Sequence, residues 1–264
     1  AAEVGCNTFL LEKSNELGGL ASLISKIPAK NRLADFPHYL MHRAEQLDNL
    51  YIFKNTEGTP ENIRKFHPNI IVSSTGSAPL LPPIAGLKDR IDNEKHNIYS
   101  ILGMISHIND FPKDLEGKKV VVVGGGAVGL DVVEFFADRN ADISIVEMMD
   151  QIGRDLDPVS KNDTKTMMKK HNVHQLTKTA LLEVKDSSFL VKGDGEPYEL
   201  PFEYGFVCLG MRAQGQLYQN LTEEFSSEDV EIMNIGDSQR ARRIIDGTQE
   251  GRNILTILEQ RGYL

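Results

Sequence analysis

The sequence is poor in cysteine. Its 264 residues include only two cysteines, Cys6 and Cys208, which lie far apart and form no Cys-x-x-Cys motif. Disulfide-rich frameworks belong to oxidising compartments, whereas reduced, isolated thiols are typical of the cell interior. We therefore expect a cytoplasmic protein.

The chain also lacks a basic excess and any long apolar run. Its net charge of −9 disfavours nucleic acids and anionic membranes as partners. No apolar stretch approaches the roughly 18 residues that predict a transmembrane helix. The N-terminal AAEVGCNT has neither the basic nor the apolar region of a signal peptide. There is no initiator methionine, and residues 1–5 resemble the last turn of a helix, so we expect a fragment of a longer protein.

The most specific pattern begins at residue 118. Lys118–Val123 is an apolar, β-branched run that predicts a strand, and residues 127–137 follow with an apolar helical pattern. Between them, Gly124, Gly126 and Gly129 have the spacing G-x-G-x-x-G. A second β-rich run, residues 142–146, ends at Glu147, which is 18 residues past Gly129. Strand, glycine loop, helix, strand and terminal acid together predict a dinucleotide-binding βαβ unit.

Each glycine has a physical role in such a site. Gly124 allows the tight turn out of the strand, Gly126 lets the backbone approach a pyrophosphate, and Gly129 lets the helix pack against the sheet. The free amides and the dipole of the first helical turn then face the phosphates. We expect the whole loop to contribute, including Gly125, Ala127 and Val128. A glycine-rich turn without a ligand is the alternative.

Glu147 indicates which dinucleotide binds. A carboxylate at this position accepts hydrogen bonds from the adenosine ribose and repels a 2′-phosphate. Met148, Met149 and Asp150, which follow it, offer no cation. The sequence therefore predicts NAD rather than NADP.

The N-terminus repeats half of this pattern. Residues 7–11 predict a strand that ends at Glu12, with Lys13 next and Gly18 and Gly19 further on. A first strand with its own glycine loop does not precede it within the sequence. We therefore expect residues 1–19 to be the second half of another dinucleotide-binding unit. Its open sheet edge should either be filled by another segment or pair with a second copy of the chain.

The rest of the sequence alternates helical and strand patterns. A Gly/Pro-rich link at residues 75–86 predicts that the chain leaves its first sheet. His38 and His42 have the spacing of a metal-binding pair, but no third ligand is evident, and solvated helix histidines are the favoured alternative. Arg242 and Arg243 begin the last helix, where they either face an anion or remain solvated. Helices are expected at 35–48, 60–66, 99–108, 157–171 and 242–260, strands at 50–54, 69–74, 173–176, 205–209 and 231–235, and a β-meander at 181–200.

These motifs resemble the C-terminal part of the two-dinucleotide-binding-domain flavoproteins. The resemblance is nearest to 2,4-dienoyl-CoA reductase, trimethylamine dehydrogenase and related NADH:flavin oxidoreductases, and it covers nearly all of the chain. The segments that carry it are LLEKSNELGG (10–19), STGSAPLLPPIAG (74–86), KKVVVVGGGAVGLDVVEFF (118–136), IVEMMDQIGRDLDP (145–158), VCLGMR (207–212) and NIGDSQRARRIIDGTQEG (234–251).

The resemblance implies an α/β fold with two Rossmann-like, three-layer ββα domains, the first lacking its first strand and glycine loop. Residues 1–110 and 213–264 would form a partial FAD domain, and residues 111–212 the NAD domain. For FAD, it implies that Glu12 holds the ribose, that Gly18 and Gly19 lie along the phosphates, and that Asp237 contacts the ribityl or pyrophosphate region. The other residues implied for the FAD side are Lys13, Thr75, Gly76 and Gly236, whereas Gly210 would border the NAD site.

The implied activity is an NADH-dependent flavin oxidoreductase. In this family hydride passes from NADH to FAD, and electrons continue through an iron–sulfur cluster (4Fe-4S) to FMN in an N-terminal barrel. The cluster cysteines and the barrel are absent from the sequence, so we expect the chain alone to be inactive on the family's organic substrate. We assign no catalytic acid, base or nucleophile and no metal site. A non-catalytic domain that holds ADP or NAD is the alternative.

Overall fold

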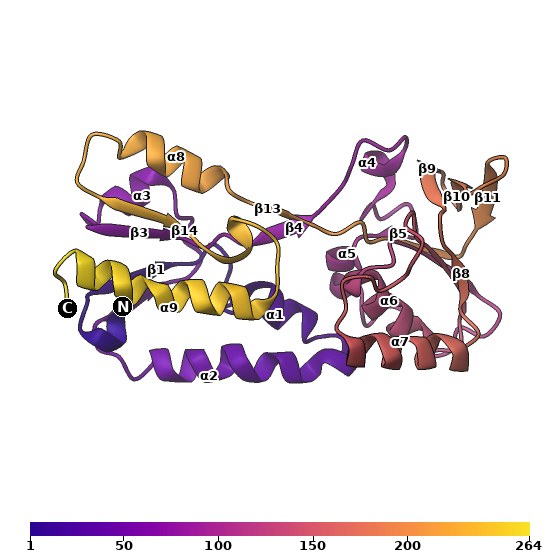
Figure 1. Cartoon of the computed structure of the whole chain (residues 1–264), viewed down its shortest axis with the longest axis horizontal. Helices are drawn as coiled ribbons and strands as arrows, with labels where there is room; N and C mark the ends of the chain where they lie inside the picture. Colours follow the sequence, from indigo (N-terminus) through magenta and orange to yellow (C-terminus); the bar gives the residue numbers. More distant parts are fainter. The chain divides into compact units, whose positions relative to one another are not determined.

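The computed structural model describes all residues, 1–264, and shows an α/β chain (Figure 1). It divides into two compact units. Unit 1 comprises Ala1–Ser25, Arg32–Ala78 and Met211–Leu264, and unit 2 comprises Lys26–Asn31 and Pro79–Gly210. None of the helices is both long enough and apolar enough to cross a bilayer.

Unit 2 is built on a five-stranded parallel sheet with the order β5-β12-β6-β7-β8. The strand β6 lies at its centre because its valines suit a strand that is covered on both faces. Residues Val120 to Val123 are at most 3% exposed. The strands are β5 (Ile98–Tyr99), β6 (Lys119–Val123), β7 (Asp142–Val146), β8 (His174–Leu176) and β12 (Tyr204–Val207).

Helix α6 (Ala127–Ala137) follows β6 and buries one apolar face against this sheet. Phe136 is fully buried and its ring lies 4.8 Å from that of Phe206 on β12. An antiparallel meander of β9 (Ala180–Val184), β10 (Ser188–Lys192) and β11 (Tyr198–Pro201) lies between β8 and β12 in the sequence. The unit is completed by α4 (Leu87–Arg90), α5 (Ile101–Ser106) and α7 (Pro158–Lys170).

Unit 1 contains two separate two-stranded parallel sheets. Strand β1 (Thr8–Leu11) pairs with β2 (Leu50–Phe53), and β3 (Ile70–Ser73) pairs with β14 (Glu231–Asn234). A small core of Ile71, Leu221 and Phe225 joins the second sheet to its helices. The helices are α1 (Gly19–Ile24), α2 (Asp35–Ala44), α3 (Pro60–Arg64), α8 (Gln216–Glu224) and α9 (Ile244–Gln260), with 3-10 turns at Ala2–Val4 and Gly236–Ser238. A further 3-10 turn, Pro28–Ala34, includes residues of both units.

Most predicted elements are present, with differences where the local pattern was ambiguous. Tyr99 was expected in a helix but ends β5, because Ser100 caps α5 by accepting the Gly103 amide. The Gly/Pro link contains a strand, β4 (Ser77–Pro79), which pairs with β13 (Met211–Ala213). Helices α1 and α8 were not predicted. Residues 79–110, grouped with the first domain in the sequence analysis, pack in unit 2.

Candidate dinucleotide-binding sites

The glycine loop of unit 2 joins the end of β6 to the start of α6. Gly124 has a φ of 110°, and a Cβ atom there would lie 2.1 Å from the carbonyl oxygen of Cys208. A Cβ on Gly129 would lie 1.9 Å from the carbonyl oxygen of Gly124. Both positions therefore require glycine for the packing of the loop itself.

Gly126 differs from these two glycines. Its φ is −80°, which other residues adopt readily, and an added Cβ would meet no atom of the protein within 4 Å. The fold therefore does not require glycine here. A ligand that approaches the backbone would require it, because a side chain would occupy the ligand's space.

The first turn of α6 has the features of an anion site. Gly126 is the N-cap, and no side chain caps the turn, so the amides at its start are free to meet an anion. Ala127 is exposed and Val128 half-buried, so the turn is accessible. With eleven residues, α6 also provides a dipole that favours negative charge at this end. These residues fit a pyrophosphate.

Glu147 lies beside this loop, as the sequence predicted. Gly125 donates its amide hydrogen to Glu147 Oε2 at 2.7 Å, and Met149 donates to Oε1 at 2.8 Å. The carboxylate is therefore held in one orientation while each oxygen keeps a lone pair for a further donor. A ribose diol is such a pair of donors, and a phosphate is not.

Cys208 packs against the glycine loop. It is buried, and burial raises the pKa of its thiol to about 12. Its backbone carbonyl faces Gly124, and its Cβ would lie 3.5 Å from a Cβ on Gly129. The thiol therefore serves packing, since it stays protonated and is remote from solvent.

One charged cluster of unit 2 was not predicted. Lys30 Nζ lies 3.0 Å from Asp131 Oδ1 and 3.1 Å from Glu134 Oε2, both on α6. Burial raises the pKa of Asp131 despite the neighbouring ammonium. Burial alone would lower the pKa of Lys30, but the two carboxylates outweigh it and raise that pKa. Nothing in the sequence predicted this contact, because Lys30 lies about 100 positions before Asp131 and Glu134.

Unit 1 reproduces part of the Glu147 arrangement. Glu12 follows β1 and accepts the amide of Ser14 through Oε1 at 2.7 Å, as Glu147 accepts that of Met149. No protein group donates a hydrogen bond to Glu12 Oε2, whereas the matching oxygen of Glu147 accepts one from the Gly125 amide. Lys13, next to Glu12, is exposed. The two carboxylates thus share one local geometry.

The other residues predicted for FAD lie in turns of unit 1. Gly18 and Gly19 have φ values of 101° and 52° and open the six-residue helix α1. Gly76 has a φ of 73°, and the hydroxyl of Thr75 donates to the Gln214 carbonyl at 2.6 Å. Gly210, which was predicted to border the NAD site, lies in unit 2, where it has a φ of 101° and its carbonyl accepts the amide of Leu80.

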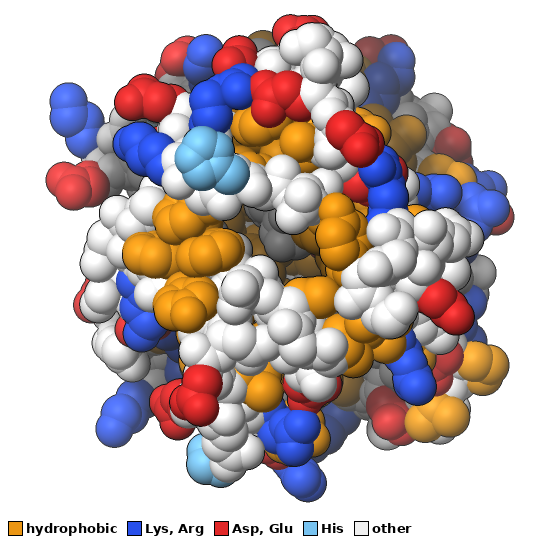
Figure 2. Space-filling view, turned by 90° about the vertical axis from the view of Figure 1, so that its left-hand side faces the viewer, with side chains coloured by type: hydrophobic (Ala, Val, Ile, Leu, Met, Phe, Trp, Pro, Cys, Tyr) orange, Lys and Arg blue, Asp and Glu red, His pale blue; other side chains and the backbone are white.

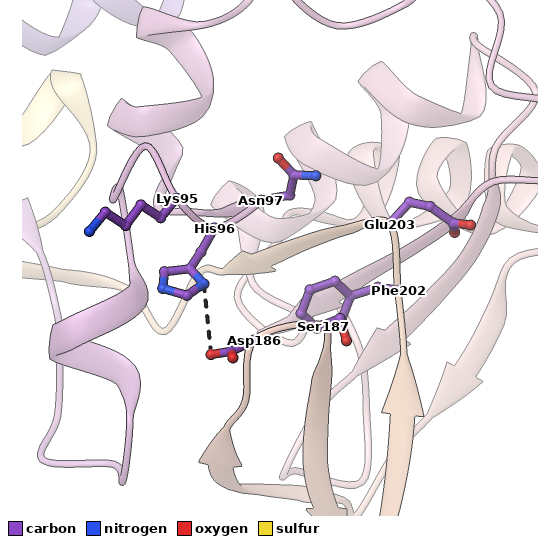
Figure 3. Close-up of a pocket in the computed structure, with 7 residues that line it drawn as sticks. All are labelled: Lys95, His96, Asn97, Asp186, Ser187, Phe202 and Glu203. Atoms are coloured by element: carbon purple, nitrogen blue, oxygen red, sulfur yellow. Dashed lines mark ion pairs between the residues drawn. The ribbon is translucent and has the colours of Figure 1, made fainter.

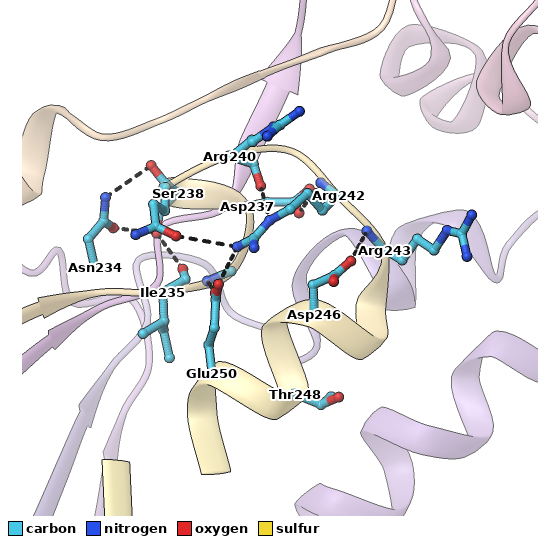
Figure 4. A network of polar contacts seen from close by, with 12 residues as sticks. Asn234, Ile235, Asp237, Ser238, Arg240, Arg242, Arg243, Asp246, Thr248 and Glu250 are labelled. Carbon is cyan, nitrogen blue, oxygen red and sulfur yellow. Dashed lines mark hydrogen bonds and ion pairs between the residues drawn. The ribbon is translucent and has the colours of Figure 1, made fainter. Parts of the chain in front are cut away.

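Asp237 belongs to a polar network that also includes Arg242 and Glu250 (Figure 4). Its Oδ2 accepts from the hydroxyl of Ser77 at 2.9 Å, and its Oδ1 accepts from the amide of Arg242 at 2.9 Å. Gly236 donates its amide to Glu250, which also pairs with the Arg242 guanidinium. These two donors lower the pKa of Glu250, the Gly236 amide most. Arg242 therefore has a carboxylate partner within the protein.

Helix α9 begins later than predicted. Arg243 is its N-cap residue, and the side chain of Asp246 accepts the Arg243 amide at 3.1 Å. Ser77 and Glu250 were not predicted as partners of this segment. Ser77 lies in the STGSAP part of segment 74–86, one of the segments that carry the family resemblance. That segment could have indicated Ser77 as a site residue.

A pocket of about 340 Å³ in unit 2 lies apart from the glycine loop (Figure 3). His96 Nδ1 faces Asp186 Oδ1 at 3.8 Å, and Arg90 donates to the same oxygen at 2.8 Å. None of its lining residues belongs to the predicted site. They are Lys95, His96, Asn97, Asp186, Ser187, Phe202 and Glu203. No group of three or more His, Cys, Asp or Glu side chains is placed to hold a metal ion.

Comparison with known proteins identifies the family. The family profile described as pyridine nucleotide-disulphide oxidoreductase matches residues 40–233, which is well over half of the chain. The chain belongs to this family.

Relatives in this family are longer. The chain is 25% identical over 252 residues to an NADH oxidase of Thermoanaerobacter brockii, covering 95% of this chain and 37% of the relative. It is 26% identical over 289 residues to a metal reductase of Desulforamulus reducens, covering 96% and 40%. The chain thus spans about two fifths of the length of these relatives.

Solved structures show the same fold. A 2-naphthoyl-CoA reductase complex matches with a TM-score of 0.80 at 23% identity, over 95% of this chain and 36% of that one. Histamine dehydrogenase from Rhizobium sp. 4-9 matches with a TM-score of 0.77 at 15% identity, over 94% and 38%. The Rossmann-like α/β fold expected from the sequence is therefore confirmed.

Proposed function

We propose that the chain is the pyridine-nucleotide-binding portion of an NADH-dependent flavoprotein oxidoreductase. Unit 2 would bind NADH, with the pyrophosphate at the amides of Ala127 and Val128 and the adenosine ribose at Glu147. The single observation that carries this proposal is the contrast between Gly126 and its neighbours. Gly124 and Gly129 are required by the fold, whereas Gly126 leaves open space next to free amides.

In this proposal the hydride-transfer chemistry belongs to the bound cofactors. The protein's residues bind and orient them. Glu147, fixed by two amides, would hold the ribose, and the first turn of α6 would counter the charge of the phosphates. Electrons would pass from NADH to FAD and then to an FMN and 4Fe-4S module outside residues 1–264. The size of the relatives supports such a module.

In the intact protein, FAD would be held by residues of unit 1, namely Glu12, Lys13, Gly18, Gly19, Thr75, Gly76, Gly236 and Asp237. The two sheets of unit 1 are not joined to each other by a strand, and Glu12 Oε2 has no donor. We therefore expect residues 1–264 to bind FAD weakly or not at all. A purified chain that is yellow with stoichiometric FAD would contradict this expectation.

Calorimetry with NADH tests the main proposal. We expect saturable binding to the wild-type chain and weaker binding to Gly126→Ala. The absence of heat at millimolar NADH, with a folded protein, would overturn the proposal. The same titration with NADPH tests the preference that Glu147 implies, and tighter binding of NADPH would contradict it.

A second candidate is a non-catalytic domain that holds ADP or NAD as a fixed ligand. Glu12 Oε2 lacks the amide donor that Glu147 Oε2 receives from Gly125, and this difference favours the second candidate. Only unit 2 then has a complete nucleotide-binding arrangement. A longer protein that includes the complete flavin site would separate the two candidates. Bleaching of the flavin absorbance by NADH supports the oxidoreductase, and an unchanged spectrum supports the non-catalytic domain.

A further inference from the structure

Two of the eight methionines of the chain are exposed, and both lie next to the proposed ribose site. Met148 is 68% exposed and Met149 is 39% exposed, and they directly follow Glu147 in the sequence. The other six methionines are half-buried or buried, namely Met41, Met104, Met167, Met168, Met211 and Met233. The exposed thioethers of the chain are therefore concentrated at one position.

Exposed apolar side chains also occur away from this site. In unit 1, Phe9, Tyr51 and Phe53 are 37–45% exposed, and hydrophobic side chains gather on the face of unit 1 that Figure 2 shows. Those three side chains contain no sulfur. Among the exposed hydrophobic residues, only Met148 and Met149 carry a group that a mild oxidant converts from apolar to polar.

Backbone hydrogen bonds fix the methionines beside the carboxylate. The amide of Met149 donates to Glu147 Oε1 at 2.8 Å, and the carbonyl of Met149 accepts the amide of Lys178 at 2.8 Å. Thr179, the next residue of that loop, donates its amide to the Glu147 carbonyl at 2.9 Å. The loop after β8 therefore holds the backbone that carries the two thioethers in place next to Glu147.

The two thioethers suit the adenine of a bound NADH. Adenine is joined to its ribose by a single glycosidic bond, so a ribose held by Glu147 places the adenine close to the residues beside Glu147. Thioethers make favourable contacts with aromatic rings, and the flexible methionine side chain adapts to a flat ligand. More than a third of each side chain is open to such a ligand.

We propose that Met148 and Met149 are an oxidation site that lowers the affinity of unit 2 for NADH. This inference rests on the proposed function, because it requires the adenosine of NADH at Glu147. The product of oxidation, methionine sulfoxide, is polar and chiral, so it replaces an apolar contact with adenine by a polar group. NADH binding then decreases when the oxidant accumulates.

The oxidant is hydrogen peroxide. Its O–O bond breaks, and one oxygen forms an S–O bond with the thioether sulfur, which loses two electrons. The second oxygen takes both protons and leaves as water. Methionine sulfoxide reductases reverse the modification, with one enzyme for each sulfoxide epimer.

Peroxide treatment of the 264-residue chain tests the proposal. Peptide mass spectrometry measures oxidation at each methionine, and calorimetry measures the Kd for NADH before and after treatment. We expect Met148 and Met149 to be oxidised faster than the other six, because they are the exposed ones. The Kd should rise about three- to tenfold. The two sulfoxide reductases together should restore it, whereas dithiothreitol alone, which reduces oxidised cysteines, should not.

The decisive variant is Met148→Leu/Met149→Leu. Leucine is apolar but cannot be oxidised, so the Kd of this variant, whatever its value, should be the same before and after peroxide. The matched control is Met41→Leu/Met233→Leu, which replaces two half-buried methionines of unit 1. This control should lose affinity on treatment as the wild-type chain does.

Three results would overturn the proposal. They are oxidation of Met148 and Met149 no faster than that of the other methionines, an unchanged Kd once both are oxidised, and an equal rise of the Kd in the double leucine variant. In each of these cases the untreated chain still binds NADH, so the proposed function stands. A folded, untreated chain that does not bind NADH would instead overturn the proposed function, and this inference with it.

Discussion

The carbonyl oxygen of Gly124 lies 1.9 Å from the position that a Cβ atom on Gly129 would occupy. Gly129→Ala therefore forces the loop and helix α6 apart, and we expect it to destabilise the chain by about 1–3 kcal/mol. Urea unfolding measures this change. Loss of NADH binding by this variant would follow from distortion of the site and would not identify a ligand contact.

Gly126→Ala is the informative partner of that variant. Because an added Cβ at Gly126 meets no protein atom within 4 Å, we expect a stability change below about 1 kcal/mol, the cost of alanine at a helix N-cap. The Kd for NADH should rise about tenfold or more, equivalent to about 1.4 kcal/mol. Calorimetry and urea unfolding on the same preparation check both. Unchanged affinity in a folded variant would contradict the site.

Glu147→Gln tests the recognition of the ribose. The amide side chain keeps one oxygen acceptor but loses the charge and one acceptor oxygen, so the bonds from Gly125 and Met149 cannot both persist unchanged. We expect NADH to bind several-fold more weakly and the preference for NADH over NADPH to decrease. Parallel titrations with the two nucleotides measure this ratio. Glu134→Gln, on the same unit but facing Lys30, is the control and should leave the ratio unchanged.

Cys208 gives the stability a specific pH dependence. Burial raises the pKa of its thiol from 9.0 to about 12, so above pH 9 the unfolded chain loses this proton while the folded chain keeps it. The protonated thiol of Cys208 contributes fully to the free energy of unfolding below pH 9. This contribution decreases as the pH rises toward 12, by up to about 4 kcal/mol. Cys208→Ala should therefore flatten the decline of unfolding free energy in this range. Identical slopes in the two proteins would contradict the burial of the thiol.

Substitution of Lys30 should lower the free energy of unfolding, because the buried carboxylate of Asp131 then lacks its cation. Lys30→Met leaves a largely desolvated carboxylate without its cation, and we expect a destabilisation of about 1–2 kcal/mol at pH 7. The loss should decrease at acidic pH, because the pKa of Asp131 is already raised and a protonated carboxyl group needs no cation. Urea unfolding at several pH values measures it. Lys26→Met, an exposed lysine without an ion pair, is the control.

The central βαβ unit could be predicted because its signals are local. The valine run of β6, the glycines of the loop and the apolar face of α6 are contiguous, and the observed bounds of β6, α6 and β7 lie within one residue of those expected. Tyr99 shows the limit of local pattern. An apolar stretch fits a strand or a helix equally, and the parallel pairing of Tyr99 with Phe206 decided between them.

The sequence by itself determined the fold class, the family resemblance and the position of the glycine loop, because spacing along the chain sets them. Only the tertiary structure distinguished Gly126 from Gly124 and Gly129, since this depends on which atoms surround each Cβ position. Only the structure paired Lys30 with Asp131 and Ser77 with Asp237, contacts between residues about 100 and 160 positions apart. Long-range contacts are chosen by packing, in which many weak interactions act together, and no short stretch of sequence encodes them.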